Sequence, residues 1–218
     1  MNLSGKTAIV TGGNSGLGLE IVNELKEKGC QVITVGKTNS NLTCDLRDYE
    51  QIKALRINKV DVLINCAGII AYQPLEKHNP QNIKDVIDTN LLGTIYMTQR
   101  VLPIMIQQNS GIIFNISSTS GLMTGGHSGE SVYMASKYGV SGFTEGLKKE
   151  MEADKRKIKV IGFYPGGMNT ELFSKSGQDK DTSSFMDPKE IAKIIVFVLE
   201  RPDSINIDHL VVNRNKSI

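Results

Sequence analysis

The sequence predicts an α/β fold in which a doubly wound, mostly parallel seven-stranded sheet carries helices on both faces. Short runs rich in β-branched residues alternate with longer amphipathic stretches along the chain. Several runs are almost continuously apolar, as in parallel strands that are buried on both faces. Since crossovers between parallel strands are right-handed, this alternation is typical of a Rossmann-type sheet. We expect the strands at residues 6–10, 31–35, 41–44, 61–65, 111–116, 158–163 and 208–212.

Two of the expected helices carry clear start or stop signals. Leu17, Ile21 and Leu25 share one face of a helix that should end at Gly29. Another should begin with Asp187 as N-cap and Pro188 in its first turn, ahead of the apolar stretch that follows. Only about five residues separate the second strand from the third, so a tight loop must replace the usual crossover helix. Since no linker or internal repeat interrupts the pattern, residues 1–218 are predicted to form one domain.

Composition and charge argue against several classes of protein. Of the 218 residues, 39% are apolar and 22% are charged, which is ordinary for a globular protein. The net charge of +2 provides no basic field, so nucleic acid is not an expected partner. No apolar run approaches the roughly 20 residues of a membrane helix and no signal peptide opens the chain, so we expect a cytoplasmic protein. The three cysteines and three histidines lack metal-ligand spacing, which predicts free thiols and no metal site.

The first strand leads directly into a glycine-rich turn at residues 11–18, with the sequence TGGNSGLG. Small residues let the backbone approach a pyrophosphate, whose charge is stabilised by amides at the positive end of the following helix. A glycine-rich turn alone marks many loops, but this one follows a strand and opens a helix, as a dinucleotide site requires. Its spacing is G-x-x-x-G-x-G rather than the G-x-G-x-x-G of ordinary dinucleotide folds.

This turn resembles the phosphate loop of the short-chain dehydrogenase/reductase family, T-G-x-x-x-G-x-G, at every fixed position. The resemblance covers nearly the whole chain and includes an N-x-A-G element at 65–68 and a P-G element at 165–166. It implies an enzyme that moves a hydride between a nicotinamide cofactor and a carbonyl or alcohol carbon. The cofactor-binding residues that it implies, together with those indicated by the loop itself and by the end of the second strand, are Gly12, Asn14, Ser15, Gly16, Leu17, Gly18, Lys37, Thr38, Asp45, Leu46, Asn65, Ala67, Gly68, Tyr133, Lys137, Pro165, Gly166, Met168 and Thr170.

The end of the second strand favours NADP(H) over NAD(H). Folds that bind NAD carry an acid about 20 residues past the glycines, where it binds the ribose 2′-hydroxyl. Here the chain reads Val35-Gly36-Lys37-Thr38, without a carboxylate. Lys37 offers a positive charge to a 2′-phosphate, and Thr38 offers a hydrogen bond. An exposed loop cation is the plain alternative for Lys37, and NAD(H) is therefore retained as a second cofactor.

Tyr133 and Lys137 stand four residues apart and therefore share one helix face. Such a pair is common by chance, yet the serine-rich end of the fifth strand lies just upstream, where open α/β sheets bind ligands. Tyr133 can donate a proton to a developing alkoxide, and a neighbouring ammonium lowers a phenol pKa. The family resemblance implies a catalytic set of Asn90, Ser118, Tyr133 and Lys137, with Ser117 as the alternative serine.

The segments expected to choose the substrate are two loops. The loop at 123–129 is longer than in common family members, and His127 within it is a candidate substrate contact. Residues 168–187 are expected to form a substrate loop in which the polar stretch 174–184 acts as a mobile lid. Four residues flank this lid, either as an apolar wall or as ordinary packing residues: Leu172, Phe173, Phe185 and Met186.

We therefore expect an NADP(H)-dependent oxidoreductase with Tyr133 as general acid/base and a small-molecule carbonyl or alcohol as substrate. A catalytically silent NADP(H)-binding sensor or scaffold is the alternative from another class, and the complete catalytic set argues against it. A sugar-nucleotide epimerase would use the same tyrosine and lysine but usually needs a substantial C-terminal lobe, whereas only about fifty residues follow Pro165. The family resemblance also implies a homodimer or homotetramer that pairs through the helices at 81–107 and 132–153.

Overall fold

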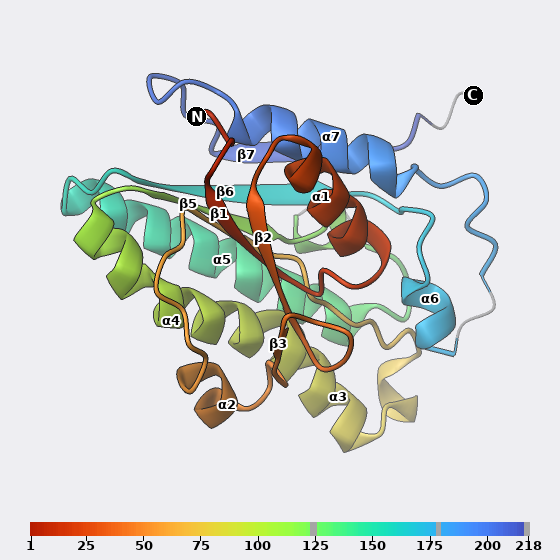
Figure 1. The fold of residues 1–218 in the computed structure, drawn as a ribbon. Coiled ribbons are helices and arrows are strands. Elements are labelled where there is room, and N and C mark those ends of the chain that lie inside the picture. The colour runs from red at the N-terminus through yellow and green to blue at the C-terminus, as the bar shows by residue number, and fades with distance from the viewer. Residues whose placement is uncertain (123–125, 178–179, 216–218) are drawn as a thin grey trace.

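The computed structural model describes residues 1–122, 126–177 and 180–215, and its architecture is the expected α/β fold (Figure 1). The sheet has seven strands in the order β3-β2-β1-β4-β5-β6-β7, and each pair of neighbours is parallel. The order runs outward from β1 and β4 in both directions, so the sheet is doubly wound as predicted. The strands are β1 (Thr7–Thr11), β2 (Gln31–Gly36), β3 (Leu42–Thr43), β4 (Val62–Asn65), β5 (Gly111–Ile116), β6 (Ile158–Pro165) and β7 (His209–Val212).

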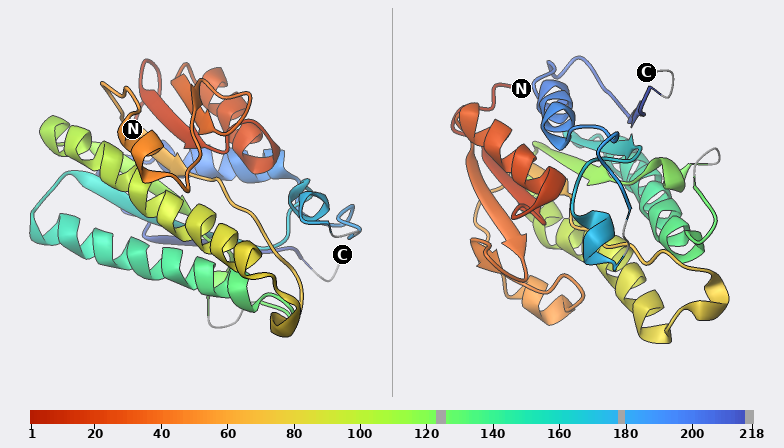
Figure 2. Two further views of the ribbon diagram at one scale, coloured as in Figure 1. Left: turned by 90° about the horizontal axis from the view of Figure 1, so that it is seen from below. Right: turned by 90° about the vertical axis from the view of Figure 1, so that its right-hand side faces the viewer.

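Helices cover both faces of the sheet. They are α1 (Gly16–Glu27), α2 (Tyr49–Lys53), α3 (Pro80–Ile87), α4 (Gly93–Gln108), α5 (Ser131–Ala153), α6 (Leu172–Lys175) and α7 (Pro188–Leu199), with 3₁₀ turns at Leu75–Lys77 and Thr119–Gly121. In Figures 1 and 2, α1 and α7 lie side by side on one face, and the long helices α4 and α5 lie on the other. Helix α7 begins as predicted, because the Asp187 side chain accepts a hydrogen bond from the Lys189 amide.

The alternation along β1 shows how one strand supplies two cores. Ala8 and Val10 pack into the cluster beneath α1 and α7, whereas Ile9 between them packs into the cluster beneath α4 and α5. Because both faces are covered, all five residues of β1 are buried. The near-continuous apolar runs in the sequence are explained by this two-sided burial.

The connection from β2 to β3 is the tight loop that the sequence predicts. It joins Gly36 to Leu42 without a helix, and Asn39 adopts a left-handed backbone conformation with φ of 48°. The side chain of Asn41 fastens this loop to β2, since its Oδ1 accepts hydrogen bonds from the Thr34 amide and hydroxyl. A short, closed loop of this kind holds the end of β2 near the glycine-rich turn.

The long helix expected at 81–107 is divided by a π-helical turn. Helices α3 and α4 are joined through Asp88–Leu92, where the Gly93 amide donates to the Asp88 carbonyl five residues earlier. Asn90 lies in the middle of this turn and is 1% exposed. A π-turn is rare and often occurs at functional sites. The sequence pattern does not distinguish it from an α-turn, because both present similar apolar faces.

Buried amide side chains link the centre of the sheet to the helices beneath it. Asn65 Nδ2 donates to Asn115 Oδ1 at 2.8 Å and to Thr98 Oγ1 at 3.0 Å. Asn115 Nδ2 donates in turn to Thr144 Oγ1 at 3.0 Å. These contacts connect β4 and β5 to α4 and α5 through polar groups that are all at most 3% exposed.

Within the described ranges, no helix combines the length and apolar character needed to cross a membrane. The same ranges contain no group of three or more histidine, cysteine or acidic side chains that could hold a metal ion.

Candidate active site

The glycine-rich turn presents an uncompensated helix N-terminus. Helix α1 follows Ser15 as N-cap, whose side chain makes no capping hydrogen bond, and its first turn contains no acidic residue. The free amides and the helix dipole therefore favour an anion there. Gly12 has φ of 67°, and a Cβ at this position would lie 2.9 Å from Ala67 Cα. A Cβ on Gly18 would collide with the Gly12 carbonyl oxygen, so the close packing of this turn requires glycine.

A cavity of about 800 Å³ runs from this turn to the carboxyl ends of β4, β5 and β6. All the predicted cofactor residues except Asn65 line it, and so do Ser118, Tyr133 and Lys137 of the predicted catalytic set. The structure does not bring Asn65 or Asn90 to the cavity wall, because their side chains bond within the protein. The turn thus fits a dinucleotide phosphate, and the predicted catalytic residues Ser118, Tyr133 and Lys137 line the same cavity.

Tyr133 lies in the first turn of α5 and is 8% exposed. Burial raises the pKa of its phenol to about 12, a hydrogen bond with the Ser118 side chain opposes this rise, and the negative charge of Glu130 adds to it. The phenol therefore carries its proton at neutral pH. The Ser118 hydroxyl also accepts from the Ser120 amide at 3.1 Å, which fixes its orientation.

Ser117 has a different role from its neighbour. Its hydroxyl donates to the Lys137 carbonyl at 3.0 Å and lies 3.1 Å from Ser141 Oγ. Its side chain therefore braces α5 against the end of β5, whereas the Ser118 side chain bonds with Tyr133. These contacts distinguish the two serines that the sequence left as alternatives.

Lys137 lies one turn after Tyr133, and its Nζ donates to the Ile116 carbonyl at the end of β5 at 2.9 Å. The ammonium is 5.8 Å from the centre of the Tyr133 ring. Burial lowers the pKa of Lys137 to about 8, because an ammonium is poorly solvated there. The positive charge is thus held beside the phenol, in a position to stabilise phenolate when it forms.

Asn90 acts on the backbone around the site. Its Oδ1 accepts from the Ile69 amide at 2.8 Å, while its Nδ2 donates to the Ile69 carbonyl at 2.9 Å and to Ser136 Oγ at 3.0 Å. Ser136 Oγ donates in turn to the Tyr133 carbonyl at 2.6 Å. Asn90 therefore ties the loop after β4 to the helix that carries Tyr133.

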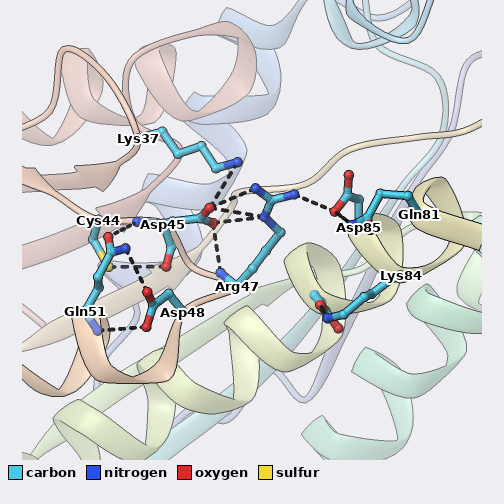
Figure 3. A network of polar contacts seen from close by, with 10 residues as sticks. Lys37, Cys44, Asp45, Arg47, Asp48, Gln51, Gln81, Lys84 and Asp85 are labelled. Atoms are coloured by element: carbon cyan, nitrogen blue, oxygen red, sulfur yellow. Dashed lines mark hydrogen bonds and ion pairs between the residues drawn. The ribbon is translucent and has the colours of Figure 1, made fainter.

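A network of four charged residues occupies the other end of the cavity (Figure 3). Lys37 Nζ lies 3.2 Å from Asp45 Oδ2, and Arg47 Nη2 lies 2.9 Å from the same oxygen. Arg47 also pairs with Asp85 in helix α3. Although burial raises the pKa of Asp45, hydrogen bonds from Arg47 and Lys37 outweigh it and lower this pKa to about 2. Asn14 Nδ2 joins the glycine-rich turn to this region by donating to the Thr38 carbonyl at 2.7 Å.

The two ends of the expected substrate loop are bound together. Met168 and Met186 form a parallel β-bridge, and the Asn169 amide donates to the Met186 carbonyl at 2.9 Å. Leu172, Phe173 and Phe185 line the cavity, whereas Met186 packs against the core. The sequence allowed two roles for these four residues, cavity wall or ordinary packing. The structure places the first three in the cavity wall and Met186 in the packing. Residues 178–179 of the expected lid and 123–125 of the longer loop lie outside the described residues.

The cavity-lining residues that were not identified from the sequence include four charged ones: Arg47, Asp85, Glu130 and Lys180. Arg47 and Asp85 meet near Lys37, and Lys180 lies 4.6 Å from the centre of the Phe173 ring. Glu130 is 4% exposed and lines the cavity beside Tyr133. A charged residue only three positions before the tyrosine was a visible signal for Glu130, but its burial became apparent only in the fold. His127 does line the cavity, as expected for a candidate substrate contact.

Comparisons with known proteins agree with this geometry. Residues 6–181 match the family model described as short chain dehydrogenase. An uncharacterized oxidoreductase of Staphylococcus saprophyticus is 30% identical over 236 residues, which cover 97% of this chain and 98% of the relative. The closed form of serine dehydrogenase complexed with NADP+ is similar with a TM-score of 0.83 at 27% identity, over 94% of each chain. ElxO with NADP bound is similar with a TM-score of 0.82 at 25% identity, over 96% of this chain and 97% of that one.

Proposed function

Because the chain belongs to the short-chain dehydrogenase/reductase family of NAD(P)-dependent oxidoreductases, we propose that it transfers a hydride between NADP(H) and a carbonyl or secondary alcohol carbon. One observation carries the proposal: Ser118, Tyr133 and Lys137 line the same cavity as the phosphate-binding turn. The substrate is a small molecule that enters at the tyrosine end. Residues 168–187 act as its loop within a single domain of residues 1–218.

The chain's own residues handle the proton. NADP(H), when bound, supplies or accepts the hydride. Tyr133 acts as general acid in reduction, because its raised pKa keeps the phenol protonated at neutral pH. Ser118 shares a hydrogen bond with Tyr133, so both hydroxyls address one substrate oxygen and stabilise the charge that develops on it. Lys137 stabilises the phenolate after proton transfer and holds the nicotinamide ribose, and Asn90 positions the loop and helix around them.

The preference for NADP(H) is supported by the residues after β2. Gly36, Lys37 and Thr38 line the cavity and offer space, charge and a hydroxyl to a 2′-phosphate. Arg47 adds a second positive charge to the same end. Two of the similar structures carry NADP by their descriptions. NAD(H) remains the alternative cofactor in the test below.

Cofactor titration followed by a carbonyl panel tests the proposal. The purified protein is titrated with NADPH and with NADH while cofactor fluorescence is followed. Aldehydes and ketones are then added, and NADPH consumption is recorded. We expect tighter binding of NADPH and turnover of at least one carbonyl; binding of neither nucleotide would refute the proposed function.

Tyr133→Phe is the control that separates catalysis from binding. It should bind NADPH as the wild type does and lose turnover by several orders of magnitude, because no other group replaces the phenol proton. A wild type that binds NADPH without turning over any carbonyl would favour the sensor or scaffold alternative.

We also infer that the protein is a homodimer or homotetramer that pairs through α4 and α5. Tyr138 on α5 is exposed in the single chain, which supports an apolar contact there. Light scattering coupled to gel filtration measures the assembly directly, and a monomeric mass would refute this inference.

A further inference from the structure

Glu130 is a buried acid in the wall of the active-site cavity. It is the N-cap residue of α5, so it lies just ahead of Tyr133 in the same helical turn. Two neutral donors bind its Oε2: the Ser120 hydroxyl at 2.8 Å and the His127 amide at 3.2 Å. These bonds fix the orientation of the carboxylate. They leave acceptor capacity, because a carboxylate offers about four lone-pair directions.

The carboxylate has no ion-pair partner of its own in the part of the chain that the structure describes. The neighbouring cations are engaged elsewhere: Lys137 donates to the Ile116 carbonyl, and Lys180 lies over the aromatic rings of Tyr72, Phe173 and Phe185. An unpaired buried charge is costly, and proteins normally provide it with a counter-ion. Since Glu130 lines the cavity, a counter-ion can reach its carboxylate from there.

The charge of Glu130 also acts on the proton donor. Burial raises the pKa of Tyr133 and that of Tyr72, whose ring lies beside Gly129, and the charge of Glu130 adds to both shifts. A catalytic phenol is not helped by an uncompensated anion in the reaction step that forms phenolate. A cation bound at Glu130 would remove this handicap while substrate is present.

We propose that the substrate carries a protonated amine close to the reacting carbon and that Glu130 binds this ammonium group. The inference rests on the proposed function and names the substrate class of the same site. In the reductive direction the carbonyl carbon receives a hydride from NADPH and the oxygen receives the Tyr133 proton. The carbonyl becomes a secondary alcohol as NADPH becomes NADP+, and the ammonium group is unchanged. Tyr72, Phe173 and Phe185 offer aromatic surface to the remainder of the molecule.

Two ketones of nearly the same shape test the charge requirement. α-Aminoacetophenone (PhCO–CH2–NH3+) and propiophenone (PhCO–CH2–CH3) differ in an ammonium group that replaces a methyl group, and both carry an aryl ring for the aromatic wall. Each is assayed with NADPH slightly below neutral pH, so that the amine is protonated. We expect kcat/KM to favour α-aminoacetophenone by roughly tenfold to a hundredfold, as for a charged hydrogen bond.

Glu130→Gln removes the charge and retains an oxygen for the Ser120 and His127 donors. The preference should fall to near unity in this variant. Glu190→Gln is the matched control: it neutralises an exposed acid outside the cavity wall, paired with Lys193, and should leave the preference in place. Titration with NADPH verifies that each variant is folded.

The outcomes separate this inference from the proposed function. Turnover of both ketones at equal kcat/KM, or a preference that persists in Glu130→Gln, overturns the ammonium site and leaves hydride transfer standing. If no ketone is reduced, calorimetric titration of the NADPH complex with α-aminoacetophenone tests the ammonium site directly. Binding that is weakened at least tenfold in Glu130→Gln supports the ammonium site without the reaction, and binding that is absent or unchanged overturns it.

Discussion

Lys37 Nζ lies 3.2 Å from Asp45 Oδ2, so the cation proposed to select the cofactor already has an ionic partner. Arg47 binds the same carboxylate and links it to Asp85. To bind a 2′-phosphate, Lys37 must therefore exchange the Asp45 carboxylate for the phosphate. The charge available to the phosphate depends on this whole network and not on Lys37 alone. Since Lys37 is half-exposed, its pair with Asp45 is weak enough to be exchanged.

Lys37→Ala should weaken the binding of NADPH more than that of NADH. The expected difference is about 1.5 kcal/mol, the lower end of the range for a charged hydrogen bond, because the ammonium is partly solvated. Fluorescence titrations of both cofactors with both proteins measure this difference. Equal losses for NADPH and NADH would show that Lys37 does not contact the 2′-phosphate.

Asp45→Asn should shift the cofactor preference in the opposite direction. Removal of the carboxylate frees Lys37 and leaves Arg47 with only Asp85, so the affinity ratio of NADPH to NADH should rise several-fold. The shift should shrink at high salt, where exposed charges are screened. A ratio that is unchanged at low salt would mean that the network does not act on the 2′-phosphate.

Ser118→Ala should mainly lower the catalytic rate, whereas Ser117→Ala should mainly lower the stability of the fold. Loss of the Ser118 hydroxyl removes a hydrogen bond near the reacting oxygen and should lower kcat about 10²-fold or more with little change in melting temperature. Loss of the Ser117 hydroxyl removes its contact with the Lys137 carbonyl and should mainly cost about 1 kcal/mol of stability. Steady-state kinetics and thermal unfolding of both variants make the comparison. The reverse pattern would assign the catalytic role to Ser117.

Lys137→Met should abolish turnover and stabilise the fold at neutral pH. Burial lowers the pKa of Lys137 to about 8, so the folded ammonium carries a solvation penalty of roughly 1–3 kcal/mol. Between about pH 8 and the ordinary lysine pKa near 10.4, the unfolded chain binds more protons than the folded one. The wild type should therefore gain stability relative to the variant as pH rises through this window. Denaturant unfolding of both proteins at neutral and alkaline pH measures this gain. A difference in unfolding free energy between the two proteins that does not change with pH would contradict the burial argument.

The features that could be predicted from the sequence are those set by residues close together along the chain. The strand and helix succession, the glycine turn and the loop without a helix after Gly36 all follow from short-range patterns, and the structure has each of them. Strand ends moved by a residue or two, as at 41–44, where only Leu42–Thr43 pair with β2. Most of the predicted site residues meet in one cavity because the carboxyl ends of parallel strands share one edge of the sheet.

What the sequence missed depends on contacts between distant segments. Arg47 reaches Asp85 from a different part of the chain, and no local pattern encodes that pair. Asn65 was expected beside the cofactor, yet its side chain faces Asn115 and Thr98 inside the core. Glu130 was passed over because an acid in a loop is normally solvated, and only the folded chain buries it.

The Asn65–Asn115 pair also sets the alignment of two central strands during folding. The two residues are register partners in β4 and β5, and their amides are joined across the pair. If either strand slipped by one position, its asparagine would turn to the opposite face and both buried amides would lose this bond, at about 1–3 kcal/mol for each unsatisfied group. Apolar neighbours such as Ile64 and Phe114 carry no side-chain hydrogen-bonding groups, so a shifted alignment leaves none of their polar atoms unsatisfied. This polar pair therefore favours one alignment of two otherwise apolar strands, and it keeps in register the strand ends from which the cavity-lining loops depart.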